Sequence, residues 1–134
     1  MARNFVVLGL GACLVAGCMN VATLGANQIA KSTKANAEVE LAHWAYWDDN
    51  CEGEPFDVAI LTPPANGRTE IRDSVYAIPT KTSSGALTGC VDKIVESKQV
   101  FYIPNEGFKG EDAATVEFSG SSGVVTNAYS IRVR

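Results

Sequence analysis

The sequence has a single histidine, His43, and no two cysteines in Cys-x-x-Cys spacing. Zinc sites and dithiol redox centres are built from such residues at short spacings, so no motif for either is present. The Gly-x-Ser-x-Gly sequence of serine hydrolases is absent as well. The sequence therefore predicts a protein that is not an enzyme and that holds no metal or cofactor. A pair of carboxylates from separate strands stays open, because its geometry is a tertiary property.

Basic residues are also scarce. Eleven lysines and arginines stand against 15 aspartates and glutamates, which gives a net charge of −4, and no basic run interrupts this balance. Proteins that bind nucleic acid or anionic lipid by charge need the opposite sign, so both classes of ligand are excluded. The low charged fraction of 19% and the 12 glycines favour an extracytoplasmic β domain over a helical one.

An apolar segment near the N-terminus, Phe5 to Gly17, follows the basic side chain of Arg3. The segment is shorter than the ~20 residues that a transmembrane helix needs, and its glycines lower its helix propensity. A basic start, an apolar run and small residues at its end are typical of a secretory signal peptide. A signal that is cut elsewhere and a retained membrane anchor are the alternatives.

The signal ends in Leu14-Val15-Ala16-Gly17-Cys18, which resembles the lipobox of bacterial lipoproteins. The resemblance implies a signal peptide over residues 1–17, cleavage before Cys18, lipidation of its sulfur and acylation of the new amine. Several acyl chains, palmitate among them, hold a protein firmly to a bilayer, whereas one holds it marginally. Since no aspartate follows Cys18, the family rule implies the outer membrane of a host with two membranes. Periplasmic and surface exposure both stay open.

The remaining cysteines predict a disulfide. Cys13 lies in the signal and Cys18 takes the lipid, so Cys51 and Cys90 are left in an oxidising compartment with one possible pairing. Such a loop would stabilise the fold by roughly 3 to 4 kcal/mol in the chain-entropy model. A redox or metal-binding pair is the alternative.

After the signal, the sequence predicts a flexible lipidated tether over residues 18–37 and one domain over 38–134. Within the domain, alternation and turn residues predict strands at 38–42, 56–62, 68–72, 74–78, 91–95, 99–103, 114–118 and 125–134, with an exposed loop at 80–89. Seven or eight short strands and no amphipathic helix are typical of an all-β protein. We expect an Ig-like antiparallel β-sandwich of about seven strands with one disulfide.

Four ring-bearing side chains follow the first predicted strand and form a candidate contact surface: His43, Trp44, Tyr46 and Trp47. The interpretation we favour is that these rings cover the core of the sandwich or its open end, since aromatic residues are common core material. The acidic turn at residues 48–54 does not match the spacing of a calcium-binding loop, which favours a solvated loop. Calcium binding there stays open.

A second family resemblance lies in residues 100–112. Their pattern Y-x-P-x-x-G-F-x-G-x-D resembles a signature of bacterial Ig-like and cadherin-like repeats, and the turn at 60–68 is similar to another of their motifs. Each position has a structural reason: proline ends a strand, glycines permit tight turns, phenylalanine caps the core and aspartate accepts backbone N–H groups. The residues in question are Tyr102, Pro104, Gly107, Phe108, Gly110 and Asp112.

Together these features predict a non-enzymatic, membrane-anchored lipoprotein whose partners are membrane lipid, through its acylated N-terminus, and other envelope or surface proteins. It would act as an accessory subunit of a secretion channel, pilus or flagellar structure, or as an adhesin. The alternative is a module that binds carbohydrate or inhibits lytic enzymes, which the clustered tryptophans favour. The partner, the copy number and the oligomeric state stay open.

Overall fold

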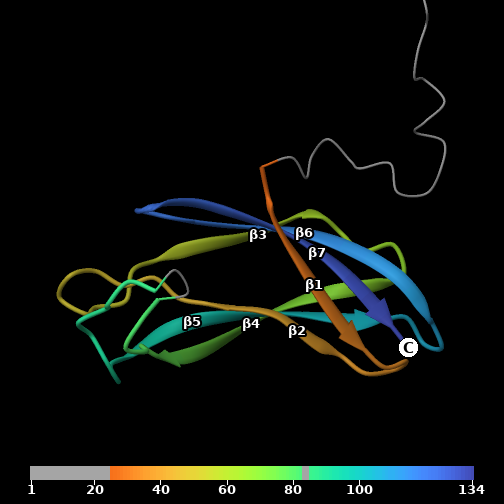
Figure 1. The fold of residues 1–134 in the computed structure, drawn as a ribbon, viewed down its shortest axis with the longest axis horizontal. Coiled ribbons are helices and arrows are strands. Elements are labelled where there is room, and N and C mark those ends of the chain that lie inside the picture. Colours follow the sequence, from red (N-terminus) through yellow and green to blue (C-terminus); the bar gives the residue numbers. More distant parts are fainter. Residues whose placement is uncertain (1–24, 83–84) are drawn as a thin grey trace, which may run out of the picture.

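The computed structural model describes residues 25–82 and 85–134 (Figure 1). The expected signal peptide, Cys18 and the tether up to residue 24 lie outside the described residues. The described part contains no helix long and apolar enough to span a membrane. Its seven strands confirm the all-β prediction: β1 (Asn27–Thr33), β2 (Val39–Trp44), β3 (Phe56–Thr62), β4 (Gly67–Ala77), β5 (Ile94–Pro104), β6 (Gly110–Gly120) and β7 (Gly123–Val133).

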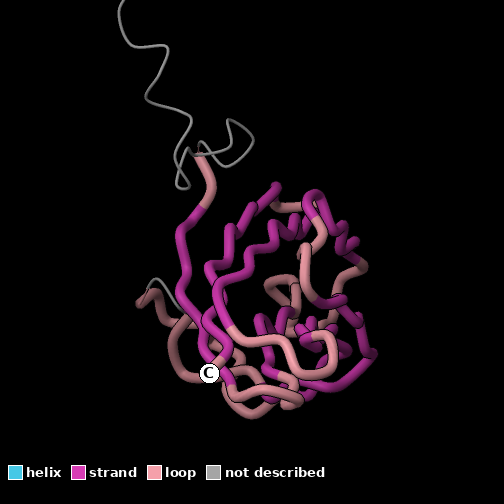
Figure 2. Tube along the Cα trace, turned by 90° about the vertical axis from the view of Figure 1, so that its right-hand side faces the viewer, coloured by secondary structure: helices cyan, strands magenta, loops and turns pink. Residues whose placement is uncertain are grey.

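The strands form two sheets that face one another as the two layers of a sandwich (Figures 1 and 2). One sheet has the order β1-β7-β6-β3 and the other the order β2-β5-β4. Lettered in chain order from A′ to G, these sheets read A′GFC and BED, which is an Ig-like arrangement. The predicted Ig-like sandwich is therefore confirmed. β3 and β4 are edge strands of opposite sheets, joined by the short turn after Thr62.

The main core lies between the sheets and is built from alternate side chains of both. β6 and β7 form the centre of the four-stranded sheet and supply most of it, while β2 and β5 supply the facing side. Its buried members are Leu41, Val100, Tyr102, Ala114, Val116, Phe118, Tyr129, Ile131 and Val133.

The prediction of a flexible tether over 18–37 is wrong for residues 27–33, which form β1. β1 pairs with β7 from Asn27 opposite Asn127 to Thr33 opposite Val133, and this pair is parallel, a departure from the expected antiparallel sheets. Figure 2 shows the end of β1 beside the C-terminus. Main-chain hydrogen bonds need no apolar pattern, which is why the sequence did not reveal this strand. The domain thus begins before residue 38 and includes β1.

In two places, one long strand replaces two consecutive short strands that the sequence predicts. β4 covers 68–72 and all but the last residue of 74–78, and β5 covers 99–103 and the end of 91–95. Charged side chains hid this continuity, because they interrupt the apolar alternation. Asp73 lies opposite Lys98 in the β4–β5 register, and the two form an ion pair with 2.7 Å between Nζ and Oδ1. This ion pair therefore lies in the middle of two long strands that continue on both sides of it.

β5 changes its buried face along its length. Val100 and Tyr102 are buried near one end, whereas Val95 and Ser97 are buried near the other. Successive side chains of a strand point to opposite faces, so these two pairs lie on opposite sides of the sheet. Val100 faces the main core, and Val95 joins a second cluster on the outer side with Ile78, Cys90, Ala45, Trp47, Cys51 and Tyr76.

Candidate functional site

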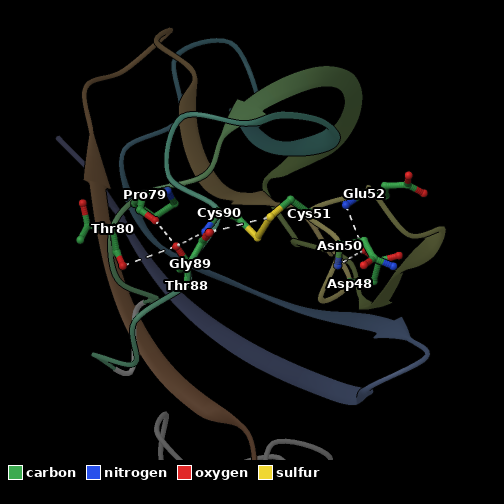
Figure 3. The surroundings of a disulfide bond; sticks show 9 residues. All are labelled: Asp48, Asn50, Cys51, Glu52, Pro79, Thr80, Thr88, Gly89 and Cys90. Carbon is green, nitrogen blue, oxygen red and sulfur yellow. Dashed lines mark hydrogen bonds between the residues drawn. A yellow bond between two sulfur atoms is a disulfide. The ribbon is translucent and has the colours of Figure 1, made fainter.

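The predicted disulfide is present and holds the second cluster together. Cys51 in the β2–β3 loop is bonded to Cys90 in the β4–β5 loop, 39 residues later (Figure 3). A loop of this length corresponds to about 4 kcal/mol of stabilisation in the chain-entropy model. The bond therefore fixes two loops to each other at one end of the sandwich.

Both loops are also ordered by their own side chains (Figure 3). In the acidic turn, Asp48 Oδ1 accepts the N–H groups of Asn50 at 2.8 Å and Glu52 at 3.0 Å. In the other loop, the Thr88 hydroxyl donates to the Pro79 carbonyl at 2.6 Å. Asp48 thus acts as a turn-forming acceptor. Within residues 25–82 and 85–134, no three potential metal-ligating side chains are grouped.

The four rings of the candidate contact surface divide between two sides of the three-stranded sheet. Trp44 points between the sheets and stacks on Phe118, with 4.6 Å between ring centroids and 16° between planes. The nearby ring of Tyr46 packs on Phe56 at 5.2 Å. The indole Nε1 of Trp44 is buried and has no hydrogen-bond partner among the described residues. These two aromatic side chains therefore complete one end of the main core.

The other two rings lie in the second cluster. His43 Nε2 is 2.8 Å from the buried Ser97 Oγ, and its ring meets Tyr76 edge-on at 5.1 Å. Trp47 stacks on Tyr76, with ring centroids 6.3 Å apart and 20° between planes. All four rings are half-buried and do not form one exposed platform. This packing favours the interpretation that they cover the core and its open end.

Asp112 is the centre of the turn motif and links three segments. Its carboxylate accepts the N–H groups of Ala65 and Asn66 at 2.9 Å each, both in the β3–β4 turn. It also accepts the Tyr102 hydroxyl at 2.8 Å. Burial raises the pKa of Tyr102 above its ordinary value, and the hydrogen bond to the Asp112 carboxylate acts in the same direction. This group fixes the sandwich at the end opposite the disulfide.

The other motif residues surround the turn between β5 and β6. Pro104 is buried at the end of β5, and Phe108 packs against the main core. Gly107 and Gly110 have φ angles of 75° and 137°, a region that side chains disfavour. The Gly107 N–H donates to Asn36 Oδ1 at 2.9 Å, which ties this turn to the β1–β2 turn. The motif therefore has a structural role.

A cleft of about 790 Å³ opens at the disulfide end, between the start of β3, the last part of β4 and the first part of β5. Three carboxylates and one ammonium group line it: Glu54, Asp73, Glu96 and Lys98. Two apolar side chains in its lining are largely exposed, Val75 at 61% and Ile94 at 63%. The cleft is thus partly apolar with an excess of negative charge.

Sequence reasoning did not identify this cleft, because its lining comes from three separate segments. One signal was available: Ile71, Asp73 and Val75 alternate in a strand, so a charged side chain shares a face with two apolar ones. That combination indicates a face that is only partly covered by the opposing sheet.

No protein-family model matches the sequence, no curated protein matches it, and no solved structure matches the fold. The description of the domain as Ig-like depends on the strand order of its two sheets.

Proposed function

We propose that this chain is a lipid-anchored, non-enzymatic protein of a bacterial cell envelope, whose Ig-like domain binds other envelope or surface proteins. The observation that carries the binding role is the open cleft, where apolar Val75 and Ile94 are exposed beside an edge strand. These two side chains are diagonal neighbours on one face of the β4–β5 pair, and exposed apolar groups that lie together beside polar ones mark interaction sites. Membrane attachment is supported by the lipobox-like sequence that ends at Cys18.

The two features are compatible in space. Residues 18–26 would separate the lipid from β1, and nine residues span at most about 30 Å when fully extended. The domain would therefore stay close to the bilayer surface. β1 and β3 are opposite edges of the four-stranded sheet, so the cleft beside β3 lies on the far side from the anchored edge. A partner in the same envelope layer could reach it without displacing the anchor.

Lipid attachment is tested by labelling cells with an alkyne analogue of palmitate. We expect the full-length, C-terminally tagged chain to carry the label and to be found with membranes, and Cys18→Ser to abolish labelling. Cys13→Ser is the matched control, because Cys13 belongs to the segment that would be removed, and it should label normally. An unlabelled wild-type chain in the soluble fraction would contradict the anchoring.

Protein binding is tested by crosslinking in cells, purification in mild detergent and mass spectrometry. We expect a reproducible, stoichiometric set of envelope proteins, whose identity would place the chain in an assembly. Recovery of the monomer alone would contradict this role and would move attention to glycans and lytic enzymes.

A further inference from the structure

The outer edge of β4 has no strand beside it in the described residues. β4 is 11 residues long and pairs with β5 along its whole length, at the end of the order β2-β5-β4. In an antiparallel pair, alternate residues direct their N–H and C=O groups away from the partner strand. β4 therefore presents a row of main-chain donors and acceptors to which another extended chain can pair.

The face of β4 that borders the cleft carries the apolar side chains of Ile71 and Val75 on either side of Asp73, and it is incompletely covered. Val75 lies two positions along the chain from Asp73 and four from Ile71, and Ile71 pairs with Val100 of the main core. These side chains therefore share the face that the opposing sheet covers elsewhere. At Val75, which pairs with Glu96, the opposing sheet no longer covers this face. The inner face of the sheet continues past the edge of the core into the cleft.

The opposite face of β4 carries charged side chains that are paired within the chain. The guanidinium of Arg72 binds Glu38 at 2.7 and 3.1 Å and Glu70 at 3.0 Å, and it lies 4.0 Å from the centre of the Phe101 ring. The apolar side chains of β4 that an added strand could cover, Ile71 and Val75, therefore lie on the cleft side.

The charges of the cleft select the chemistry of the added strand. Lys98 is paired with Asp73, so it offsets only one of the three carboxylates, and Glu54 and Glu96 remain in excess. A basic side chain that enters the cleft would be attracted, and an acidic one repelled. A second copy of the chain would bring the same carboxylates together, which disfavours self-association through this edge.

We propose that the edge of β4 and the cleft beside it bind an extended segment of a partner protein by strand addition, with apolar and basic side chains of that segment entering the cleft. This inference rests on the proposed function and specifies its contact surface. Main-chain hydrogen bonds to β4 would supply general affinity, and the alternate side chains that contact Val75, Ile94 and Glu96 would supply selectivity.

The proposal is tested with two ten-residue peptides in which the odd positions, which share one face of a strand, alternate valine with lysine in one peptide and valine with glutamate in the other. The even positions are threonine in both. The protein is the full lipidated chain in mild detergent, and the readout is amide hydrogen exchange. We expect the valine–lysine peptide to slow exchange in β4 and to leave β2, the other edge of the same sheet, unchanged. The valine–glutamate peptide should bind at least tenfold more weakly. Equal binding of the two peptides, protection elsewhere, or no protection at saturating peptide would overturn the proposal.

A matched pair of variants locates the surface. Val75→Lys should weaken binding of the valine–lysine peptide at least tenfold. Val124→Lys should leave it unchanged, because Val124 is 62% exposed, like Val75 at 61%, but does not line the cleft. Glu96→Lys should remove most of the preference between the two peptides, because it leaves two carboxylates and two ammonium groups in the cleft. Equal effects of the two valine substitutions, or an unchanged preference in Glu96→Lys, would refute the assignment.

Two further outcomes separate this inference from the function on which it rests. If envelope proteins are recovered equally with the wild type and with Val75→Lys, the binding role stands and the β4 surface is wrong. If the wild type recovers no partner, the binding role itself fails. A concentration-dependent dimer that Val75→Lys abolishes would assign this edge to a second copy and would also overturn the proposal.

Discussion

Replacing Asp112 by alanine should destabilise the domain more than any exposed substitution. The carboxylate holds the β3–β4 turn through the N–H groups of Ala65 and Asn66, and it accepts the hydroxyl of the fully buried Tyr102. Asp112→Ala removes all three interactions at once. The buried hydroxyl then has no strong acceptor, whereas the two N–H groups lie in a turn that water can reach.

The magnitude follows from these differences. Hydrogen bonds to a charged group contribute about 1.5–3 kcal/mol, and a buried donor without a partner costs about 1–3 kcal/mol. Since water can replace the acceptor in the exposed turn, we expect Asp112→Ala to lower the free energy of unfolding by about 3 kcal/mol. Tyr102→Phe alone should cost about 1 kcal/mol. The double variant should cost less than the sum, because no hydroxyl is left unpaired.

The assay is urea unfolding of the four proteins, followed by tryptophan fluorescence. Asp73→Ala is the control, since its carboxylate is 87% exposed and its ion pair with Lys98 should contribute about 0–1 kcal/mol. A loss below about 0.5 kcal/mol in Asp112→Ala would refute the reasoning, as would strict additivity in the double variant.

Three further outcomes are expected. Replacing Cys51 and Cys90 together by serine should lower the free energy of unfolding by about 4 kcal/mol, measured by urea unfolding. Because burial raises the pKa of Tyr102 and Tyr129 in the folded state, stability should be unaffected by them below about pH 10 and fall as the pH rises further, with a shallower fall in Tyr102→Phe. Asn127→Ala should speed amide exchange in β1, because Asn127 bonds the Asn27 side chain at 3.0 Å; unchanged exchange would contradict this role.

The parts of the fold that the sequence predicted depend on local chemistry. Period-two alternation identified β3, β6 and β7, since each has one face toward the main core. Counting the cysteines identified the disulfide, because Cys13 and Cys18 belong to the predicted signal and lipid site and only Cys51 and Cys90 remained to be paired. The role of Asp112 followed from the tendency of aspartate to accept backbone N–H groups in turns.

The parts that it did not predict depend on contacts between distant segments. β1 is held by main-chain pairing with β7, for which its sequence has no apolar signature. β5 buries opposite faces at its two ends because the disulfide-linked loops cover one of them. Trp44 packs against the main core and Trp47 in the second cluster, on opposite sides of the same sheet. The cleft combines residues of three segments, so no local pattern could define it.

The most direct test of the central claim is photocrosslinking in cells, with a photoreactive residue at position 75 or 124 of the tagged full-length chain. We predict a stoichiometric crosslink to an envelope protein from position 75 only, mapped to an extended segment of that protein with apolar and basic residues two positions apart. A chain that forms no crosslink from either position, or that crosslinks equally from both, would contradict this claim.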